Sequence, residues 1–491
     1  MQLFHNEAIE AWLGESGGWL WTWIILPVVA IVGLYFTIRT GAVQARMLPN
    51  MLRTLTDKAL VGRDGKPKSI SSFQAFTVSA ASRVGVGNVA GVATAIAIGG
   101  PGAVFWMWIM AFIGGASSFV ESTLGQLYKE KSSDGYIGGP AYYMQKGLKA
   151  RWLGIVFAVI LVICFPIAFS SLQANTIAQA ISGAAGNSDP TLMVTIAVAL
   201  AVLTALVVFG GIRRIAQVSQ SLVPAMAVLY ILVGLLVVVV NISELPRVLG
   251  SIFTEAFNFQ SAVGGGLGAV IMQGVKRGMF SNEAGLGSAP NVGATAAVSH
   301  PVKQGLVQTL GVYFDTFVVC SVTAFIILVS VPDPLGETQG IELTQGALAD
   351  SLGAWSAVLL AVIILLLAFS SIIGNYYYGE ANIAFMTRSK AVMTAYRTLA
   401  TTAVLIGALA SVNVVWSFAD GIMGLMALTN LVSIFLLGGI ALKLLKHYSA
   451  QRALGQDPVF LATDMPELSG ITAWTPEDVE SFEPAHAKHA K

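Results

Sequence analysis

The chain has 491 residues, of which only 11% are charged and 55% are hydrophobic. Soluble proteins carry about 25% charged residues, so this composition excludes a soluble enzyme, a nucleic-acid-binding protein and a disordered chain. It predicts an all-α protein that crosses a membrane many times. The formal net charge of +1 gives no information about the partners of the protein. Cys164 and Cys320 lie in apolar runs and are expected to be buried, with no disulfide or metal between them.

Taken in chain order, the long apolar stretches predict the membrane-spanning helices. A helix needs about 20 apolar residues to cross the hydrocarbon, and about eleven stretches satisfy this requirement. They are 18–38, 71–98, 102–125, 152–182, 190–210, 215–241, 264–296, 303–330, 354–385, 396–411 and 413–443. The transmembrane domain is therefore expected over 18–445, between an N-terminal segment, 1–17, and an acidic soluble tail, 446–491.

The basic residues of the loops predict the orientation, because cytoplasmic loops are rich in lysine and arginine. The loop after the first span is strongly basic, and the loops after every second span that follows also carry bases. On the opposite side the only loop base is Arg247, and the loop 331–353 is acidic. This separation predicts an N-terminus outside the cell and a cytoplasmic C-terminus, which requires an odd number of spans.

Two of the predicted spans are interrupted by glycine and polar residues. One interruption runs from Ser82 to Gly91 and the other from Ser281 to Pro290. Glycine frees the backbone to leave the helix, and unwound backbone is tolerated at membrane depth only where it is buried or lines a cavity. Freed carbonyls can bind a cation, and N–H groups at half-helix N-termini can bind an anionic group. The alternative is that these glycines only allow close helix packing.

The spacing of the two breaks favours an internal repeat. The spans within 71–241 and within 264–443 form two sets of five, and each set opens with its broken helix. An odd number of spans in each set makes the two copies face opposite ways in the membrane. This arrangement is typical of secondary transporters that bind substrate and ions near the midplane. The sequence therefore predicts a five-plus-five inverted repeat with one extra N-terminal helix.

Ionisable residues inside spans are costly and mark candidate functional positions. Arg83 and Glu283 lie in the two breaks, and the repeat would bring them together. They could form a structural ion pair, or Arg83 could occupy a cation position or meet a substrate carboxylate. Glu121, Glu380 and Asp420 lie near span ends, where they could reach the interface or pair with loop bases.

Polar residues in two further spans could contribute ligands. Ser370 and Ser371 stand side by side in the span 354–385, but two hydroxyls bind sodium only weakly without carbonyl groups beside them. A serine in a membrane helix more often bonds the carbonyl four residues earlier. Gln173 and Asn175 would be costly facing lipid, so they either join helices or reach a substrate.

These segments together resemble the alanine or glycine:cation symporter family. The resemblance covers 18–445 and rests on Gly99–Trp108, Gln173–Asn175, Gly278–Pro290 and Leu367–Glu380. It implies import of a small neutral amino acid, alanine or glycine, coupled to sodium by alternating access in the inner membrane of a bacterial or archaeal cell. It also implies the leucine-transporter-like fold. No cofactor and no nucleic acid is implied, and sodium, as coupling ion, is the only metal.

The resemblance also assigns a sodium site and a substrate site. The sodium ligands would be three carbonyls and two hydroxyls, those of Ala81, Val84, Leu367, Ser370 and Ser371. The substrate would be bound by residues of both broken helices and two further spans: Gly85, Gly87, Asn88, Gln173, Asn282, Gly285 and Asn375. N–H groups near Gly85 and Gly87 would meet the carboxylate and the region of Asn282 the amino group, while Gln173 and Asn375 would shape the side-chain pocket.

Two positions depart from the family pattern. Many members have threonine where Arg83 stands, which bears on any second sodium site there, and many have tryptophan where Asn375 stands. An amide in place of an indole leaves more room and a hydrogen-bonding group, so glutamine or serine becomes an alternative substrate. A different small solute, or protons in place of sodium, are further alternatives. An intramembrane enzyme is disfavoured, because no histidine lies in an interrupted span and no serine–lysine or paired-aspartate arrangement is present.

Overall fold

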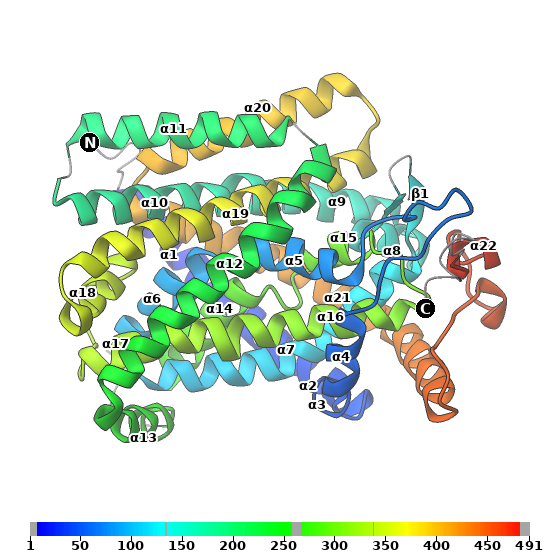
Figure 1. The fold of residues 1–491 in the computed structure, drawn as a ribbon, viewed down its shortest axis with the longest axis horizontal. Helices are drawn as coiled ribbons and strands as arrows, with labels where there is room; N and C mark the ends of the chain where they lie inside the picture. Colours follow the sequence, from blue (N-terminus) through cyan, green and yellow to red (C-terminus); the bar gives the residue numbers. More distant parts are fainter. Residues whose placement is uncertain are drawn as a thin grey trace, which may run out of the picture.

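The computed structural model describes residues 7–132, 135–187, 189–209, 211–257, 267–336 and 338–481. Its long helices lie side by side in one bundle (Figure 1). The short helices α13 (Leu245–Glu255) and α18 (Ile341–Leu352) lie at one end of this bundle. Strand β1 (Glu130–Ser132) and helices α8 (Pro140–Lys146) and α22 (Pro476–Val479) lie at the other end (Figure 1).

The helices of the first half follow the predicted spans. The chain begins with α1 (Glu7–Leu20), η1 (Trp21–Ile25), α2 (Leu26–Arg39), α3 (Val43–Arg46) and α4 (Leu48–Leu55). It continues with α5 (Ser72–Arg83), η2 (Gly87–Gly91), α6 (Val92–Gly99), α7 (Gly102–Leu127), α9 (Arg151–Val162), η3 (Ile163–Phe169), α10 (Ser170–Ala185), α11 (Pro190–Val208), α12 (Gly211–Val240) and η4 (Ile242–Glu244). Strand β2 (Gly135–Ile137) pairs antiparallel with β1 after α7.

The second half also contains long helices and one broken helix. It contains α14 (Leu267–Asn282), α15 (Ala289–Gly293), α16 (Pro301–Tyr313), η5 (Phe314–Cys320), α17 (Ser321–Ser330), α19 (Trp355–Met386), α20 (Lys390–Leu409), α21 (Val412–Ala453) and η6 (Ala462–Asp464). Between α14 and α15 the backbone is left-handed at Glu283, Gly285 and Gly287. Glycine adopts this conformation without the Cβ penalty of other residues, so the helix stops at Asn282 and restarts at Ala289.

Nine helices among the described residues are long and apolar enough to cross a membrane. A tenth is obtained if Ser72–Arg83 and Gly87–Gly99, which are bent by 54° at the first break, are counted as one span. Each of these helices coincides with a predicted span. The remaining predicted span, 264–296, begins outside the described residues and is divided between α14 and α15. The count of eleven and the inverted repeat therefore stay predictions.

The tail after α21 packs against the bundle. Trp474 is only 1% exposed, and its Nε1 donates to the carbonyls of Gln126 (3.3 Å) and Leu127 (3.1 Å) at the end of α7. The Nζ of Lys129 lies 4.4 Å above the Trp474 ring and 4.0 Å above the ring of Tyr136. The described part of the predicted soluble tail, up to residue 481, is thus a folded part of this end of the molecule.

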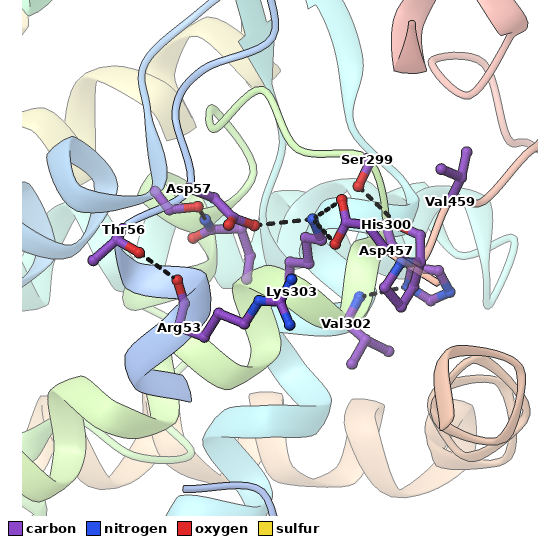
Figure 2. A network of polar contacts seen from close by, with 12 residues as sticks. Arg53, Thr56, Asp57, Ser299, His300, Val302, Lys303, Asp457 and Val459 are labelled. Carbon is purple, nitrogen blue, oxygen red and sulfur yellow. Dashed lines mark hydrogen bonds and ion pairs between the residues drawn. The ribbon is translucent and has the colours of Figure 1, made fainter. Parts of the chain in front are cut away.

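A second set of contacts joins the start of α16 to the segment after α4 and to the start of the tail. Figure 2 shows Lys303 between two carboxylates, and its Nζ lies 2.9 Å from both Asp57 and Asp457. Nε2 of His300 lies 3.1 Å from Nδ1 of His447 on α21. Burial holds the pKa of His300 well below its usual value, so this ring is neutral and shares one hydrogen bond with His447.

Candidate functional site

The break in the first helix releases two carbonyl groups. In a continuous α-helix, the N–H of Gly85 would bind the carbonyl of Ala81, and the N–H of Asn88 would bind the carbonyl of Val84. Here the N–H of Gly85 donates to Asn88 Oδ1 at 2.8 Å, and the N–H of Asn88 donates to the Gly85 carbonyl at 3.2 Å. The carbonyls of Ala81 and Val84 therefore lose their helical partners.

The released carbonyls meet two hydroxyls of α19. Ser371 Oγ lies 3.0 Å from the Ala81 carbonyl, 3.4 Å from that of Val84 and 3.1 Å from that of Leu367. Ser370 Oγ lies 3.4 Å from the Ala81 carbonyl and 2.8 Å from the Leu367 carbonyl. Each hydroxyl has one hydrogen, so most of these O···O contacts have no hydrogen between the two oxygens. A buried group of oxygens with too few hydrogens is suited to a hard cation.

Gln173 on α10 closes the first break from another side. Its Oε1 accepts the N–H of Val86 at 3.0 Å in place of a helix carbonyl. A Cβ at Gly85 would lie 2.2 Å from Ser371 Oγ and 2.9 Å from Gln173 Oε1, so only glycine allows both side chains to approach. The N–H groups of Gly85 and Val86, in the region assigned to a substrate carboxylate, are thus bonded to amide oxygens.

Asp315 on η5 connects the two breaks. Its carboxylate accepts hydrogen bonds from Asn88 Nδ2 (2.7 Å), Ser281 Oγ (2.7 Å) and Thr316 Oγ1 (3.2 Å). Asn282, at the end of α14, donates in turn to Thr316 Oγ1 at 3.1 Å. Asp315 is not among the predicted binding residues, although its carboxyl group in the apolar span 303–330 marks it in the sequence as a candidate functional position.

Glu283 in the second break lies in a separate polar cluster. Ser82 Oγ lies 2.7 Å from Glu283 Oε1 and 2.8 Å from Asn375 Oδ1, and Ser288 Oγ donates to Glu283 Oε2 at 2.6 Å. These contacts join α5, the second break and α19. The structure therefore places Asn375 beside a buried carboxyl group.

Arg83 forms no ion pair with Glu283 in the described part of the chain, although the repeat predicted their proximity. The side chain is 2% exposed, and Nη1 donates to the Gln308 carbonyl at 3.1 Å on α16. A Cβ at Gly311 would lie 2.1 Å from Nη1, so this glycine makes the space for the guanidinium. Arg83 is the last residue of α5, and its side chain points to α16. The neighbouring residue Ser82 contacts Glu283 instead.

Glu121 lies inside the bundle and not at the interface. Its carboxylate accepts the N–H groups of Gly285 (3.3 Å) and Gly287 (3.1 Å), which the second break leaves without helical partners. Asn430 on α21 donates to the same carboxylate at 2.7 Å and to the Gly285 carbonyl at 2.9 Å. Backbone groups freed inside a membrane protein must find such partners, so a carboxylate on α7 supports the irregular segment.

Aromatic rings cover the first break toward the end of the bundle with α13 and α18. Phe280 packs on Phe169 and Trp416 with ring centroids 4.6 Å and 5.4 Å apart. A Cβ at Gly87 would lie 2.8 Å from the Phe280 ring, so glycine allows this close packing. A polar cavity of about 370 Å³ adjoins Trp416.

Asp420 in the wall of this cavity pairs with bases of a broken helix, not with loop bases. It lies 2.9 Å from the Nζ of Lys276 and binds the guanidinium of Arg277 with both carboxylate oxygens. Glu380, by contrast, lies 3.6 Å from Arg397 near the start of α20, as expected for a span-end acid.

The structure brings the five predicted sodium ligands together and divides the predicted substrate residues. Gly85, Asn88 and Gln173 surround the first break. Asn282 and Gly285 belong to the second break, where they contact η5 on one side and α7 and α21 on the other. Cys164 and Cys320 are buried and unpaired, as expected. Among the described residues, no group of three His, Cys, Asp or Glu side chains could hold a metal ion.

Most of the chain matches a known family. The model of the sodium:alanine symporter family aligns with residues 6–462. The chain belongs to this family. As a member of the sodium:alanine symporter family it is a multi-pass membrane transporter, which couples amino-acid transport to the transport of a cation. It is not an enzyme.

Relatives in the sodium:alanine symporter family cover nearly the full length. The amino-acid carrier protein AlsT of Bacillus subtilis is 49% identical over 98% of this chain and 100% of its own. The probable sodium/glutamine symporter GlnT of the same organism is 47% identical over 97% and 98%. The sodium/alanine symporter AgcS of Methanococcus maripaludis is 36% identical over 88% and 96%.

A solved structure supports the fold class. The crystal structure of MhsT in complex with L-phenylalanine superposes with a TM-score of 0.56 at 14% identity, over 79% of this chain and 99% of that chain. The predicted all-α, leucine-transporter-like fold is thereby confirmed.

Proposed function

We infer that the chain imports a small neutral amino acid together with sodium by alternating access. The observation that carries this proposal is the oxygen cluster of Ala81, Val84, Leu367, Ser370 and Ser371. The two hydroxyl hydrogens are too few for all the oxygen–oxygen contacts of the cluster. A sodium ion bound there would supply the missing positive charge. It would also hold α5 against α19. Because a ligand shifts a conformational equilibrium only through unequal affinity, sodium would favour the state in which these two helices are closed.

The amino acid is proposed to bind at the first break. Its carboxylate would compete with Gln173 Oε1 and Asn88 Oδ1 for the N–H groups of Val86 and Gly85. Displacing one acceptor by another keeps the buried N–H groups bonded, so the exchange avoids the penalty of an unpaired donor. The released Gln173 amide could then face the substrate side chain. Asn282 of the second break is proposed to approach the amino group.

Glutamine is a specific second candidate for the substrate beside alanine and glycine. The predicted side-chain pocket carries two amides, Gln173 and Asn375, and Asn375 Oδ1 faces Ser82 and not an aromatic ring. Amides are well matched to a substrate amide. GlnT, at 47% identity, carries a glutamine symporter name, whereas AgcS, at 36%, carries an alanine name.

The proposed location is the inner membrane of a bacterial or archaeal cell. The loop bases support an outside N-terminus and a cytoplasmic C-terminus. With this orientation, the docked tail and the hairpin β1–β2 face the cytoplasm, and the cavity at Asp420 faces the outside.

Uptake into proteoliposomes tests the proposal. Labelled alanine, glycine, serine and glutamine are supplied outside, with an inward sodium gradient, an inward proton gradient or neither. Uptake of at least one of these amino acids should depend on the sodium gradient. Accumulation driven equally by protons without sodium would contradict sodium coupling, and the absence of gradient-driven uptake for all four would contradict amino-acid symport of this class. A thermal-shift screen with and without sodium would then identify another solute.

A further inference from the structure

A large cavity lies at the end of the bundle that carries the hairpin β1–β2. It has a volume of about 870 Å³ and is bounded by the hairpin, the start of α9, the end of α19 and the start of α20. It is separate from the helix breaks and from the polar cavity at Asp420. Nothing in the proposed transport cycle uses it.

Three basic side chains in its wall have no ion-pair partner among the described residues. They are Arg151, Arg388 and Lys390. Arg151 is held in place, because Nη1 donates to Gln145 Oε1 at 2.6 Å and the guanidinium lies 5.2 Å from the centre of the Phe385 ring. The cavity therefore carries a fixed guanidinium and two uncompensated charges beside it.

The other charged residues of the wall are already neutralised. Glu130, the one acid among the described residues of the lining, lies 2.9 Å from the Nζ of Lys146. Lys131 lies 2.9 Å from Asp478 of the docked tail. Among the described residues, no carboxylate therefore offsets the charge of Arg151, Arg388 and Lys390.

Two helix N-termini add to this positive potential. α9 begins at Arg151 and α20 begins at Lys390, so both helices start in the cavity wall. The first N–H groups of a helix lack internal partners, and the helix dipole is positive at this end. Helix N-termini combined with arginine and lysine are the protein groups that bind phosphate.

The cavity also lies at the level expected for lipid headgroups. Trp152, beside Arg151, is 66% exposed, as is typical of aromatic residues at the membrane–water interface. Val156, further along α9, and Leu399, further along α20, are exposed apolar residues suited to contact with acyl chains. The cavity lining also includes the apolar side chains of Phe385 and Met393.

We propose that this cavity binds the phosphate headgroup of an anionic phospholipid. Arg151, Arg388 and Lys390 would hold the phosphate, and the acyl chains would continue along the exposed apolar faces. Basic pockets between transmembrane helices on the cytoplasmic side bind such headgroups. The site goes beyond the transport function, but it touches the same helix, because α19 carries Ser370 and Ser371 and ends in the cavity wall at Met386.

The test uses the full-length protein in detergent, with thermal unfolding followed during titration of three probes. These are dioctanoyl phosphatidylglycerol, dioctanoyl phosphatidylcholine and inorganic phosphate. The variant is Arg388→Gln/Lys390→Gln, whose side chains are exposed and make no ion pairs in the described structure. The matched control is Arg53→Gln/Lys58→Gln, two exposed bases outside the cavity.

The anionic lipid should raise the Tm of the parent and of the control, and the other two probes should not. In the variant, the half-saturating lipid concentration should rise roughly 30-fold, since each base near the membrane surface contributes to anionic-lipid binding. Equal stabilisation by phosphatidylcholine would overturn the proposal, as would an equal loss in the control. Stabilisation by phosphate alone would identify a soluble phosphate compound and overturn the lipid assignment. Native mass spectrometry of the parent, with phosphatidylglycerol retained no better than phosphatidylcholine, would overturn it independently of any variant.

Discussion

The oxygen cluster at the first break and the docked tail satisfy their polar groups in opposite ways. At the break, Ser370 and Ser371 share two hydroxyl hydrogens among the three carbonyls of Ala81, Val84 and Leu367. In the tail region, by contrast, charges meet opposite charges. The first region has acceptors to spare and is suited to receiving a cation, whereas the second is complete without a ligand.

The charge pairs of the tail region show this completeness. Lys303 lies 2.9 Å from each of two aspartates, Asp57 and Asp457, and Lys131 lies 2.9 Å from Asp478. The comparison teaches that a buried polar cluster in this protein indicates a binding function only where donors and acceptors do not balance. The same criterion separates the uncompensated bases of the lipid cavity from the paired ones beside them.

The largest effect is expected from Trp474→Ala in the tail. This side chain is buried and binds the end of α7, so its loss should weaken tail docking by about 3–5 kcal/mol, the usual cost of removing a buried tryptophan. Hydrogen exchange over 456–481 should rise strongly. Trp152→Ala, at an exposed position, serves as the control. A large change in sodium half-saturation for Trp474→Ala would break the distinction between the two regions.

Ser371→Ala tests the other side of the comparison. Removing a hydroxyl that meets three carbonyls should raise the sodium concentration for half-maximal uptake roughly 10-fold to 100-fold, the range for a lost bond to a charged group. Thermal stability without sodium should change little. Ser433→Ala, a buried serine that bonds the carbonyl four residues earlier, is the matched control. An unchanged sodium half-saturation would refute the assigned site.

Asn375→Trp sharpens the assignment of the substrate pocket. A larger ring at this position should shift uptake toward alanine and glycine and away from glutamine by roughly tenfold, because a filled pocket excludes the longer side chain. Competition between labelled substrates measures the shift. Asn375→Ala removes the amide without filling the space. If Asn375→Trp and Asn375→Ala change the preference between alanine and glutamine in the same way, Asn375 does not set the size of the substrate pocket.

The smallest effect concerns Lys129, which the tail covers. Burial lowers its pKa to about 7, while the rings of Tyr136 and Trp474 partly favour the charged form. The docked state therefore binds this proton less tightly than an exposed lysine does. The free energy of tail docking should become more favourable as pH rises above 7, by about 1 kcal/mol between pH 7 and 8. Below pH 7 the cost of burying the protonated lysine should be fully present.

Lys129→Met provides the measurement for this last prediction. The substitution keeps the apolar stem and removes the titrating group, so the pH dependence of tail exchange should flatten. A dependence that persists in Lys129→Met would contradict the assignment of this effect to Lys129.

Much of the fold could be predicted because its determinants are local in the chain. About 20 apolar residues are needed to cross hydrocarbon wherever they occur, so the long apolar helices among the described residues coincide with predicted spans. The effect of glycine on the backbone is also local, because it frees the helix to break at its own position. The two breaks could therefore be predicted from Gly85 and Gly285. The five proposed sodium ligands were predicted through a resemblance and not through residue spacing, because a carbonyl group carries no signature in the sequence.

The sequence by itself determined that the protein is a many-span membrane transporter with two broken helices. Only the tertiary structure decided which groups meet: Ser371 with the carbonyl of Ala81, Glu121 with the N–H groups of the second break, and Arg83 with α16. The physical reason is that a helix break creates unpaired backbone groups locally, whereas their partners come from helices distant in the chain. Packing, and not hydropathy, selects those partners.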